Sequence, residues 1–91
     1  MDVAARFGEN LLRCRQRANL SQEELGFLAS LHRTEIGLLE RGTRIPRIDT
    51  LVKLAGALSV PPSELIEGID WKPGSSTSGN FSVVAGDPSS N

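Results

Sequence analysis

The chain has few of the residues from which catalytic and metal sites are built, because its 91 residues include one His, one Cys and no Tyr. Cys14 alone cannot form an internal disulfide, and Cys14 and His32 offer no spacing that would hold a metal ion. There is no Gly-rich phosphate loop and no pair of carboxylates in an evident pocket, so acid–base and nucleophilic catalysis have no visible set of residues. These absences predict a protein of the reducing cytoplasm that is not an enzyme and uses no cofactor or metal.

Long apolar runs are also missing from the sequence. No stretch approaches the roughly 18 apolar residues that a membrane-spanning helix needs, so we expect a soluble protein without a membrane segment or secretion signal. A hydrophobic content of 38% in 91 residues is enough for one compact core but not for two. Since no separate ligand domain fits in this length, no small-molecule ligand is evident.

A net charge of −1 does not by itself favour a polyanion as partner. The charges are unevenly distributed, however. Between residues 33 and 53 five cations face three anions, whereas an acidic cluster lies further along, at Glu64, Glu67 and Asp70. The middle of the chain is therefore its basic part.

Apolar periodicity predicts a first helix over residues 3–18. Its stripe, at three- and four-residue steps, consists of Val3, Phe7, Leu11, Cys14 and Ala18. Asn19 tolerates the left-handed turn that ends this helix. Ser21 and Glu24 have the spacing of a capping box and mark the start of a second helix, in which Gly26 leaves room for a close neighbour.

A third helix is predicted over residues 32–41, with Ile36 and Leu39 buried and Gly42 as the left-handed residue that ends it. Pro46 excludes helix immediately before it, which makes the preceding residues a loop. A fourth helix over residues 48–58 and a short fifth helix over residues 62–67 follow; their signals are Leu51, Leu54, Ala55, Leu58 and Pro62. The expected fold is all-α, a compact five-helix bundle that contains a helix-turn-helix.

The composition changes after Trp71, where Ser, Gly, Pro and Asn become frequent. Too few apolar residues remain there to offset the entropy of ordering the chain. We therefore expect a helix-turn-helix domain at residues 1–71 and a flexible Ser/Gly-rich tail at residues 72–91. One exception stays open, because the apolar island FSVV at residues 81–84 is able to add a strand or dock on a groove.

Several of these features occur together in one known family. They are the opening Leu20-Ser21-Gln22 of the second helix, Gly26, the buried pair Ile36 and Leu39, the ending Glu40-Arg41-Gly42, and the segment from Pro46 through Leu58 with Val60. Over residues 7–69 the chain resembles the helix-turn-helix family of phage repressors and Cro proteins. The segment SLHRTEIGLLERG, residues 30–42, is similar to small controller proteins that regulate restriction-modification genes. The resemblance implies a sequence-specific transcriptional regulator that binds double-stranded DNA with its third helix in the major groove, and that is nucleoid-associated when bound.

Two positions depart from the family pattern. Ser30 stands where relatives usually carry Gly in a turn that favours positive φ, at a cost of about 1 kcal/mol. Arg47 stands at the N-cap of the fourth helix, where relatives commonly carry Ser, and a lost N-cap also costs about 1 kcal/mol. An anion such as a DNA phosphate would compensate at the second position.

With Ile36 and Leu39 inward, helical geometry predicts that Arg33, Gly37 and Arg41 form one outward row and that Thr34 and Leu38 form the next. The expected base-contacting residues are Arg33, Thr34, Gly37 and Leu38. Arg33 is the best candidate, because its guanidinium can donate two hydrogen bonds to guanine. The alternatives are a solvated Arg33, a Leu38 that rotates into the core, and a Glu35 that pairs with a neighbouring cation.

The expected phosphate contacts are Gln22, His32, Arg41, Arg44 and Arg47. Gln22 lies at the start of the second helix, where backbone N–H groups converge on an anion. For His32, capping of the third helix is an equal alternative. The resemblance further implies that Arg15 and Glu40 form a buried structural ion pair between the first and third helices.

One such domain reads only a few base pairs, and the relatives bind palindromic half-sites as two-fold dimers, so we expect a homodimer. The candidate dimer interface is Leu65, Ile66, Ile69 and Trp71, and the equal alternative for Trp71 is to fold back and seal the core. A second hypothesis is a protein-interaction module, antitoxin-like or a complex subunit, which uses the same fold and the C-terminal tail. The operator and the regulated genes are not encoded in any recognisable pattern.

Overall fold

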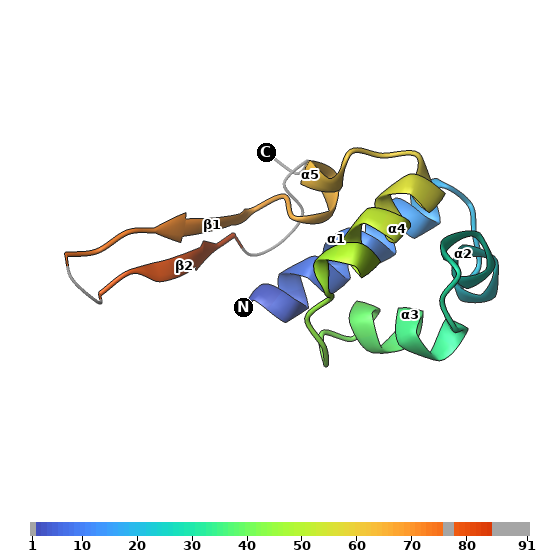
Figure 1. Cartoon of the computed structure of the whole chain (residues 1–91), viewed down its shortest axis with the longest axis horizontal. Helices are drawn as coiled ribbons and strands as arrows, with labels where there is room; N and C mark the ends of the chain where they lie inside the picture. The colour runs from blue at the N-terminus through green and yellow to red at the C-terminus, as the bar shows by residue number, and fades with distance from the viewer. Residues whose placement is uncertain (1, 76–77, 85–91) are drawn as a thin grey trace.

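The computed structural model describes residues 2–75 and 78–84. Five helices come first in the chain, and a short β-hairpin follows them (Figure 1). The bounds are α1 Val3–Arg17, α2 Gln22–Ala29, α3 Arg33–Glu40, α4 Ile48–Leu58, α5 Pro62–Leu65, β1 Ile69–Lys72 and β2 Asn80–Val83. The predicted helices agree with these bounds within two residues at either end. None of the helices in the described ranges is long and apolar enough to cross a membrane.

Local signals end and begin the helices as the sequence predicted. Ser21 Oγ accepts from the backbone N–H of Glu24 at 3.0 Å, and Glu24 Oε1 accepts from the N–H of Ser21 at 2.8 Å, which completes the capping box. Asn19, Ser30 and Gly42 have φ values of 61°, 55° and 72°. These left-handed residues turn the chain sharply after α1, α2 and α3.

One apolar core joins the helices. It consists of Phe7, Leu11, Cys14, Leu25, Ala29, Ile36, Leu39, Leu54, Ala55, Leu58 and Leu65. Two glycines let neighbouring segments approach, because a Cβ at Gly8 would lie 2.6 Å from the carbonyl oxygens of Leu39 and Glu40, and one at Gly26 would lie 2.5 Å from that of Leu31. Gly8 thus lets α1 pack against the end of α3, and Gly26 lets α2 pack against the turn that follows it.

The all-α prediction is wrong in one part. β1 and β2 pair antiparallel, with Ile69 opposite Val83 and Trp71 opposite Phe81, and the hairpin projects away from the helices (Figure 1). Residues 80–83 were expected in a flexible tail, but their alternation of apolar and polar side chains matches that of β1. The strand alternative for the island at residues 81–84 is the one that the structure adopts. The remaining tail positions 76–77 and 85–91 lie outside the described residues.

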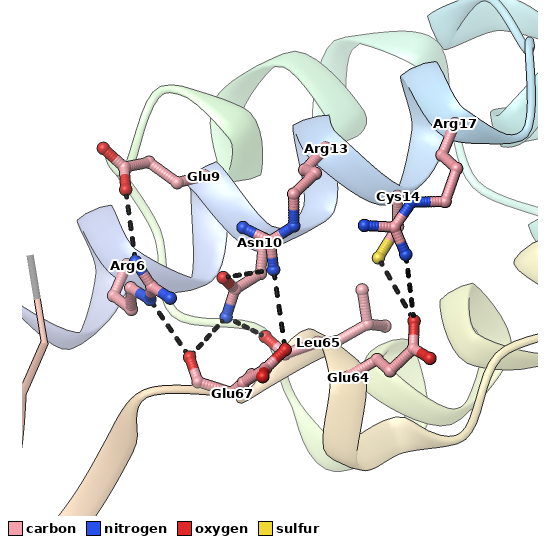
Figure 2. Close-up of polar contacts among 9 residues, drawn as sticks. All are labelled: Arg6, Glu9, Asn10, Arg13, Cys14, Arg17, Glu64, Leu65 and Glu67. Atoms are coloured by element: carbon pink, nitrogen blue, oxygen red, sulfur yellow. Dashed lines mark hydrogen bonds and ion pairs between the residues drawn. The ribbon is translucent and has the colours of Figure 1, made fainter. Parts of the chain in front are cut away.

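Two buried polar side chains of α1 hold the connection from α5 to β1 (Figure 2). Arg6 and Asn10 have no exposed surface. Asn10 Nδ2 donates to the carbonyl oxygens of Leu65 at 3.0 Å and Glu67 at 2.9 Å, and Arg6 Nε donates to that of Glu67 at 3.0 Å. Because these carbonyls are satisfied by side chains, the irregular segment after α5 can be buried against α1.

Candidate nucleic-acid interface

The segment from α2 to α3 forms a helix-turn-helix. Ser30 adopts the left-handed conformation at the end of α2, and the N–H of Leu31 donates to the carbonyl of Gly26 at 2.8 Å. Leu25 and Ala29 of α2 and Ile36 and Leu39 of α3 are buried in the common core. The opposite face of α3 is therefore held rigidly toward solvent.

Arg33 and Thr34 lie on this exposed face at the start of α3. Arg33 Nη1 is 3.1 Å from Glu23 Oε2, and the two side chains are 65% and 76% exposed. An ion pair this exposed contributes about 0–1 kcal/mol, so little holds the guanidinium away from a ligand. Leu38 and Glu35 are half-buried, which places Leu38 between the two alternatives that the sequence left open.

Gly37 is not open to solvent, contrary to the outward position expected for it. It is buried, and a Cβ there would lie 3.0 Å from Arg41 Nη1 and 3.7 Å from Gln22 Oε1. The side chains of Arg41 and Gln22 thus cover the backbone at Gly37. The absence of a side chain at this position lets α2 and the Arg41 guanidinium come close to α3.

His32 caps α3. Its Nδ1 accepts from the backbone N–H of Thr34 at 3.0 Å, which is the capping alternative that the sequence allowed. With Nδ1 as acceptor, the neutral ring carries its proton on Nε2. The exposed His32 therefore keeps one N–H donor that is not used in the cap.

Arg15, Glu40 and Gln22 form a network between α1, α3 and α2. Arg15 Nε lies 2.6 Å from Glu40 Oε2 and Arg15 Nη2 lies 3.0 Å from Oε1, while Gln22 Nε2 donates to the same Oε1 at 2.9 Å. The hydrogen bond to Glu40 raises the pKa of Arg15. The side chains of Arg15 and Glu40 are only 14% and 6% exposed, so the pair that the resemblance implied is largely shielded from water.

Three further cations surround the loop between α3 and α4: Arg41, Arg44 and Arg47, all exposed. Arg47 occupies the N-cap of α4 without a side-chain cap hydrogen bond in the described structure, as its sequence position predicted. Its Nε lies 3.4 Å from Asp49 Oδ1, with both side chains more than half exposed. The first turn of α4 therefore lies beside a solvated, positively charged loop.

The four residues expected at a dimer interface do not form one surface. Leu65 has no exposed area and belongs to the core, and Ile69 packs against that core, so the prediction is wrong for Leu65. Ile66 and Trp71 are 43% and 56% exposed. Trp71 does not seal the core; its ring meets Phe81 edge-on at 5.1 Å between centroids.

The outer face of α4 was not predicted from the sequence. Ile48 and Val52 are 80% and 56% exposed there, although both are apolar. Their four-residue spacing was visible in the sequence as a second stripe beside the buried one, and that stripe was the available signal. The burial of Arg6 and Asn10 was not predicted either; their four-residue spacing places them next to Phe7 and Leu11 on α1.

The helix-turn-helix thus presents an exposed polar helix face with cations beside it. This arrangement is typical of DNA-binding regulators. A family profile described as helix-turn-helix matches residues 11–65. The chain is similar to the control protein C.BamHI of Bacillus amyloliquefaciens, with 42% identity over 62 residues, 67% of this chain and 76% of that protein.

Solved structures agree with this match. The restriction-modification controller protein C.AhdI from Aeromonas hydrophila is 42% identical, with a TM-score of 0.67 over 68% of this chain and 94% of that one. The P22 c2 repressor, solved with a synthetic operator, is 27% identical, with a TM-score of 0.64 over 68% and 94% of the two chains. The chain belongs to the helix-turn-helix family of repressor-type DNA-binding transcription regulators. These relatives are regulators rather than enzymes.

Proposed function

We propose that the chain is a sequence-specific transcription regulator that binds a palindromic operator as a homodimer, with α3 in the major groove of double-stranded DNA in the cytoplasm. The observation that carries this proposal is the outer face of α3, where Arg33 and Thr34 are exposed while Ile36 and Leu39 anchor the helix in the core. An α-helix fits the major groove, where each base pair presents its own pattern of donors and acceptors.

Arg33 reads a guanine in this proposal. Its guanidinium leaves Glu23, whose exposed partnership is weak, and donates to O6 and N7 of the base. Thr34 contacts a neighbouring base edge, and the half-buried Leu38 contacts a thymine methyl group. Gly37 lies beneath Arg41 and Gln22, so its part is to let these two side chains lie close to the helix.

Contacts to phosphates set the register of the protein on the duplex. They are made by Gln22, His32, Arg41, Arg44 and Arg47. Gln22 lies in the first turn of α2, where backbone N–H groups favour an anion, and Glu40 orients its amide. His32 donates its Nε2–H to a phosphate. At Arg47 a phosphate accepts from the first turn of α4, whose N-cap has no side-chain hydrogen bond.

The similarity to control proteins supports a particular role. Two relatives are named as control proteins, and a structural neighbour is a restriction-modification controller. Dimerisation makes the response of such a regulator depend on its own concentration, which suits a protein that times the expression of its target genes. A homodimer then reads two half-sites about 34 Å apart.

The test is to incubate the purified protein with a randomised duplex library at moderate salt and sequence the retained DNA, beside an Arg33→Ala variant. The expected result is a palindrome with half-sites one helical turn apart, and a loss of preference at one position per half-site in the variant. Discrimination there should fall by roughly 1–3 kcal/mol, the worth of a bidentate contact to guanine. A folded protein that enriches no sequence would refute the proposal.

A second candidate function is a protein-interaction module, favoured by the exposed aromatic pair Trp71 and Phe81 on the projecting hairpin. In that case Arg33 is dispensable and the hairpin is essential. The library experiment separates the two functions, because only the DNA-binding protein loses its sequence preference with Arg33.

A further inference from the structure

One edge of the β-hairpin is open in the part of the chain that the structure describes. The N–H of Val84 donates to the carbonyl of Gly68 at 2.9 Å, and these residues lie opposite each other when the register of β1 and β2 is extended by one position. Opposite pairs in an antiparallel ladder alternate between hydrogen-bonded and non-hydrogen-bonded. Counting from Gly68, every second residue of β1 therefore points its backbone N–H and C=O groups away from β2, and these residues are Ile69 and Trp71.

Trp71 is the residue of this edge whose outward backbone groups are both available. The N–H of Ile69 already donates to the carbonyl of Ile66 at 3.1 Å. Pro73 follows at the next outward position and has no N–H to donate. Among the described residues of the edge, Trp71 thus combines a free donor with a free acceptor, and a strand that pairs here must meet it.

The side chain of Trp71 leaves the edge accessible. A Cβ at Gly79 would collide with Cζ2 of the indole, and the ring meets Phe81 edge-on at 5.1 Å between centroids. Both contacts lie on the side of β2, so the ring leans away from the open edge. A two-stranded hairpin needs further strands or packing against a helix to be stable in water. The outer half of this hairpin, where Trp71 and Phe81 are 56% and 57% exposed, has neither in the described structure.

We propose that a second copy of the chain pairs with this edge, β1 antiparallel on β1, so that two hairpins form one four-stranded sheet. A two-fold axis beside Trp71 sets this residue opposite itself, and the two copies exchange a pair of N–H···O=C hydrogen bonds there. One face of the sheet then carries a row of four aromatic rings, Phe81 and Trp71 of each copy. The inference goes beyond the proposed function, because the contact requires no DNA.

The charges of β1 favour a second copy as the occupant. With Trp71 at the axis, Asp70 of each copy lies opposite Lys72 of the other, and opposite charges at opposed positions stabilise a strand pair. Both side chains are exposed, and neither has a hydrogen-bond or ion-pair partner within residues 2–75 and 78–84. An antiparallel partner that satisfies both charges must carry Asp two residues before Lys. The sequence of β1 itself meets this condition.

The contact is short, and its ends are closed. Pro73 offers no donor to the Ile69 carbonyl of the other copy, so the new ladder holds only the two hydrogen bonds at the axis. Proline at an edge limits strand pairing in this way. The hairpin projects from the side of α1 and leaves α3 uncovered (Figure 1). Association should therefore be weak, confined to pairs, and compatible with a contact from α3 to DNA.

Disulfide trapping on the full chain tests the register. Asp70→Cys and Lys72→Cys variants are mixed in an oxidising glutathione buffer, and cross-linked dimers are measured by non-reducing electrophoresis. Opposite residues of a non-hydrogen-bonded pair have Cα atoms about 4.5 Å apart, which a disulfide can bridge. Two copies of the same variant place their cysteines on a diagonal, roughly 7–8 Å apart. The mixture should therefore give several-fold more cross-linked dimer than either variant alone.

Two controls accompany the trapping. The parent measures the background from Cys14, which is only 4% exposed. Asp70→Cys mixed with Ser82→Cys is the matched control, because Ser82 lies opposite Asp70 on β2 and away from the open edge. A mixture of Asp70→Cys and Lys72→Cys that cross-links no more than this control would overturn the inference.

The charges are tested by exchanging them. Asp70→Lys or Lys72→Asp alone sets like charges opposite each other at two positions, whereas the double variant restores opposite charges. In sedimentation velocity over a concentration series, the midpoint of association should lie roughly fivefold or more higher in each single variant than in the parent. The double variant should return to the parental midpoint, a rescue that a general loss of fold would not give. Equal midpoints in all four proteins would contradict the pairing.

The two proposals fail in different ways. A chain that selects a palindrome from the DNA library but shows neither the cross-link nor the rescue would refute the hairpin contact alone. A chain that shows both but enriches no DNA sequence would refute the proposed function alone. Cross-linking of the hairpin to an unrelated strand, without cross-linking between copies, would assign the edge to a foreign partner and overturn the choice of occupant.

Discussion

The outer faces of α3 and α4 differ in kind, although the two helices follow one another in the chain. On α3 the exposed side chains are polar, with Arg33 and Thr34 at its start, whereas on α4 the exposed stripe begins with Ile48 and Val52. A solvated guanidinium can exchange one weak partner for a base, but an exposed isoleucine gains only by leaving water. The difference supports the proposal that α3 contacts DNA, and it shows that an exposed apolar stripe can lie beside a polar face on the next helix.

Among the substitutions that test this comparison, Glu40→Ala should have the largest effect. It strands the shielded Arg15 guanidinium and removes the acceptor of the Gln22 amide, so the free energy of unfolding should fall by about 3–5 kcal/mol and DNA binding should be lost. Urea denaturation followed by circular dichroism measures the change. Glu23→Ala, which removes an exposed partner, should cost no more than about 1 kcal/mol. A Glu40→Ala variant as stable as the parent would show that the ion pair does not hold the fold.

Arg44→Ala tests the proposed phosphate contacts and should leave the fold unchanged, because Arg44 is exposed. If Arg44 contacts one phosphate, the slope of log affinity against log salt should become shallower by roughly 0.9 per protomer, with sequence preference unchanged. Fluorescence anisotropy with the selected operator at several salt concentrations gives the slope. Lys72→Ala, an exposed cation on the hairpin, is the control and should leave the slope as it is. Equal slopes for Arg44→Ala and the parent would remove Arg44 from the interface.

The smallest expected effect concerns the two turns that end α2 and α4. Ser30 after α2 and Ser59 after α4 have φ values of 55° and 56°, which cost a non-Gly residue about 1 kcal/mol. Ser30→Gly and Ser59→Gly should each raise the free energy of unfolding by roughly 0.5 kcal/mol, after the added entropy of Gly in the unfolded chain is subtracted. Thermal melting measures both. A lower melting temperature in either variant would mean that the serine side chain stabilises its turn.

The helices were predictable because their signals are local. The capping box at Ser21 and Glu24, the left-handed Asn19 and Gly42, and the periodic apolar residues each act within a few positions of the chain. The same periodicity placed Ile36 and Leu39 in the core and Arg33 outside it. That much of the site followed from the period of the helix alone.

Other features could not be predicted, because they depend on which distant segments meet. Leu65 is apolar, which suits a dimer interface as well as a core. Only the packing of α5 against α1 and α4 buries it. The hairpin depends on the pairing of residues 80–83 with β1, and the average composition of the tail concealed that pairing. Gly37 would face outward on an isolated helix, and only the side chains of Arg41 and Gln22 cover it.

The sequence by itself determined where the helices lie, how they begin and end, and that a helix-turn-helix carries the basic middle of the chain, since caps, turns and periodicity are short-range properties. Tertiary structure alone decided that Leu65 is core, that the tail contributes a strand, and that Ile48 and Val52 remain on the surface of α4. The physical reason is that α4 has more apolar residues than one face holds, and the neighbours that pack against it decide which face is buried.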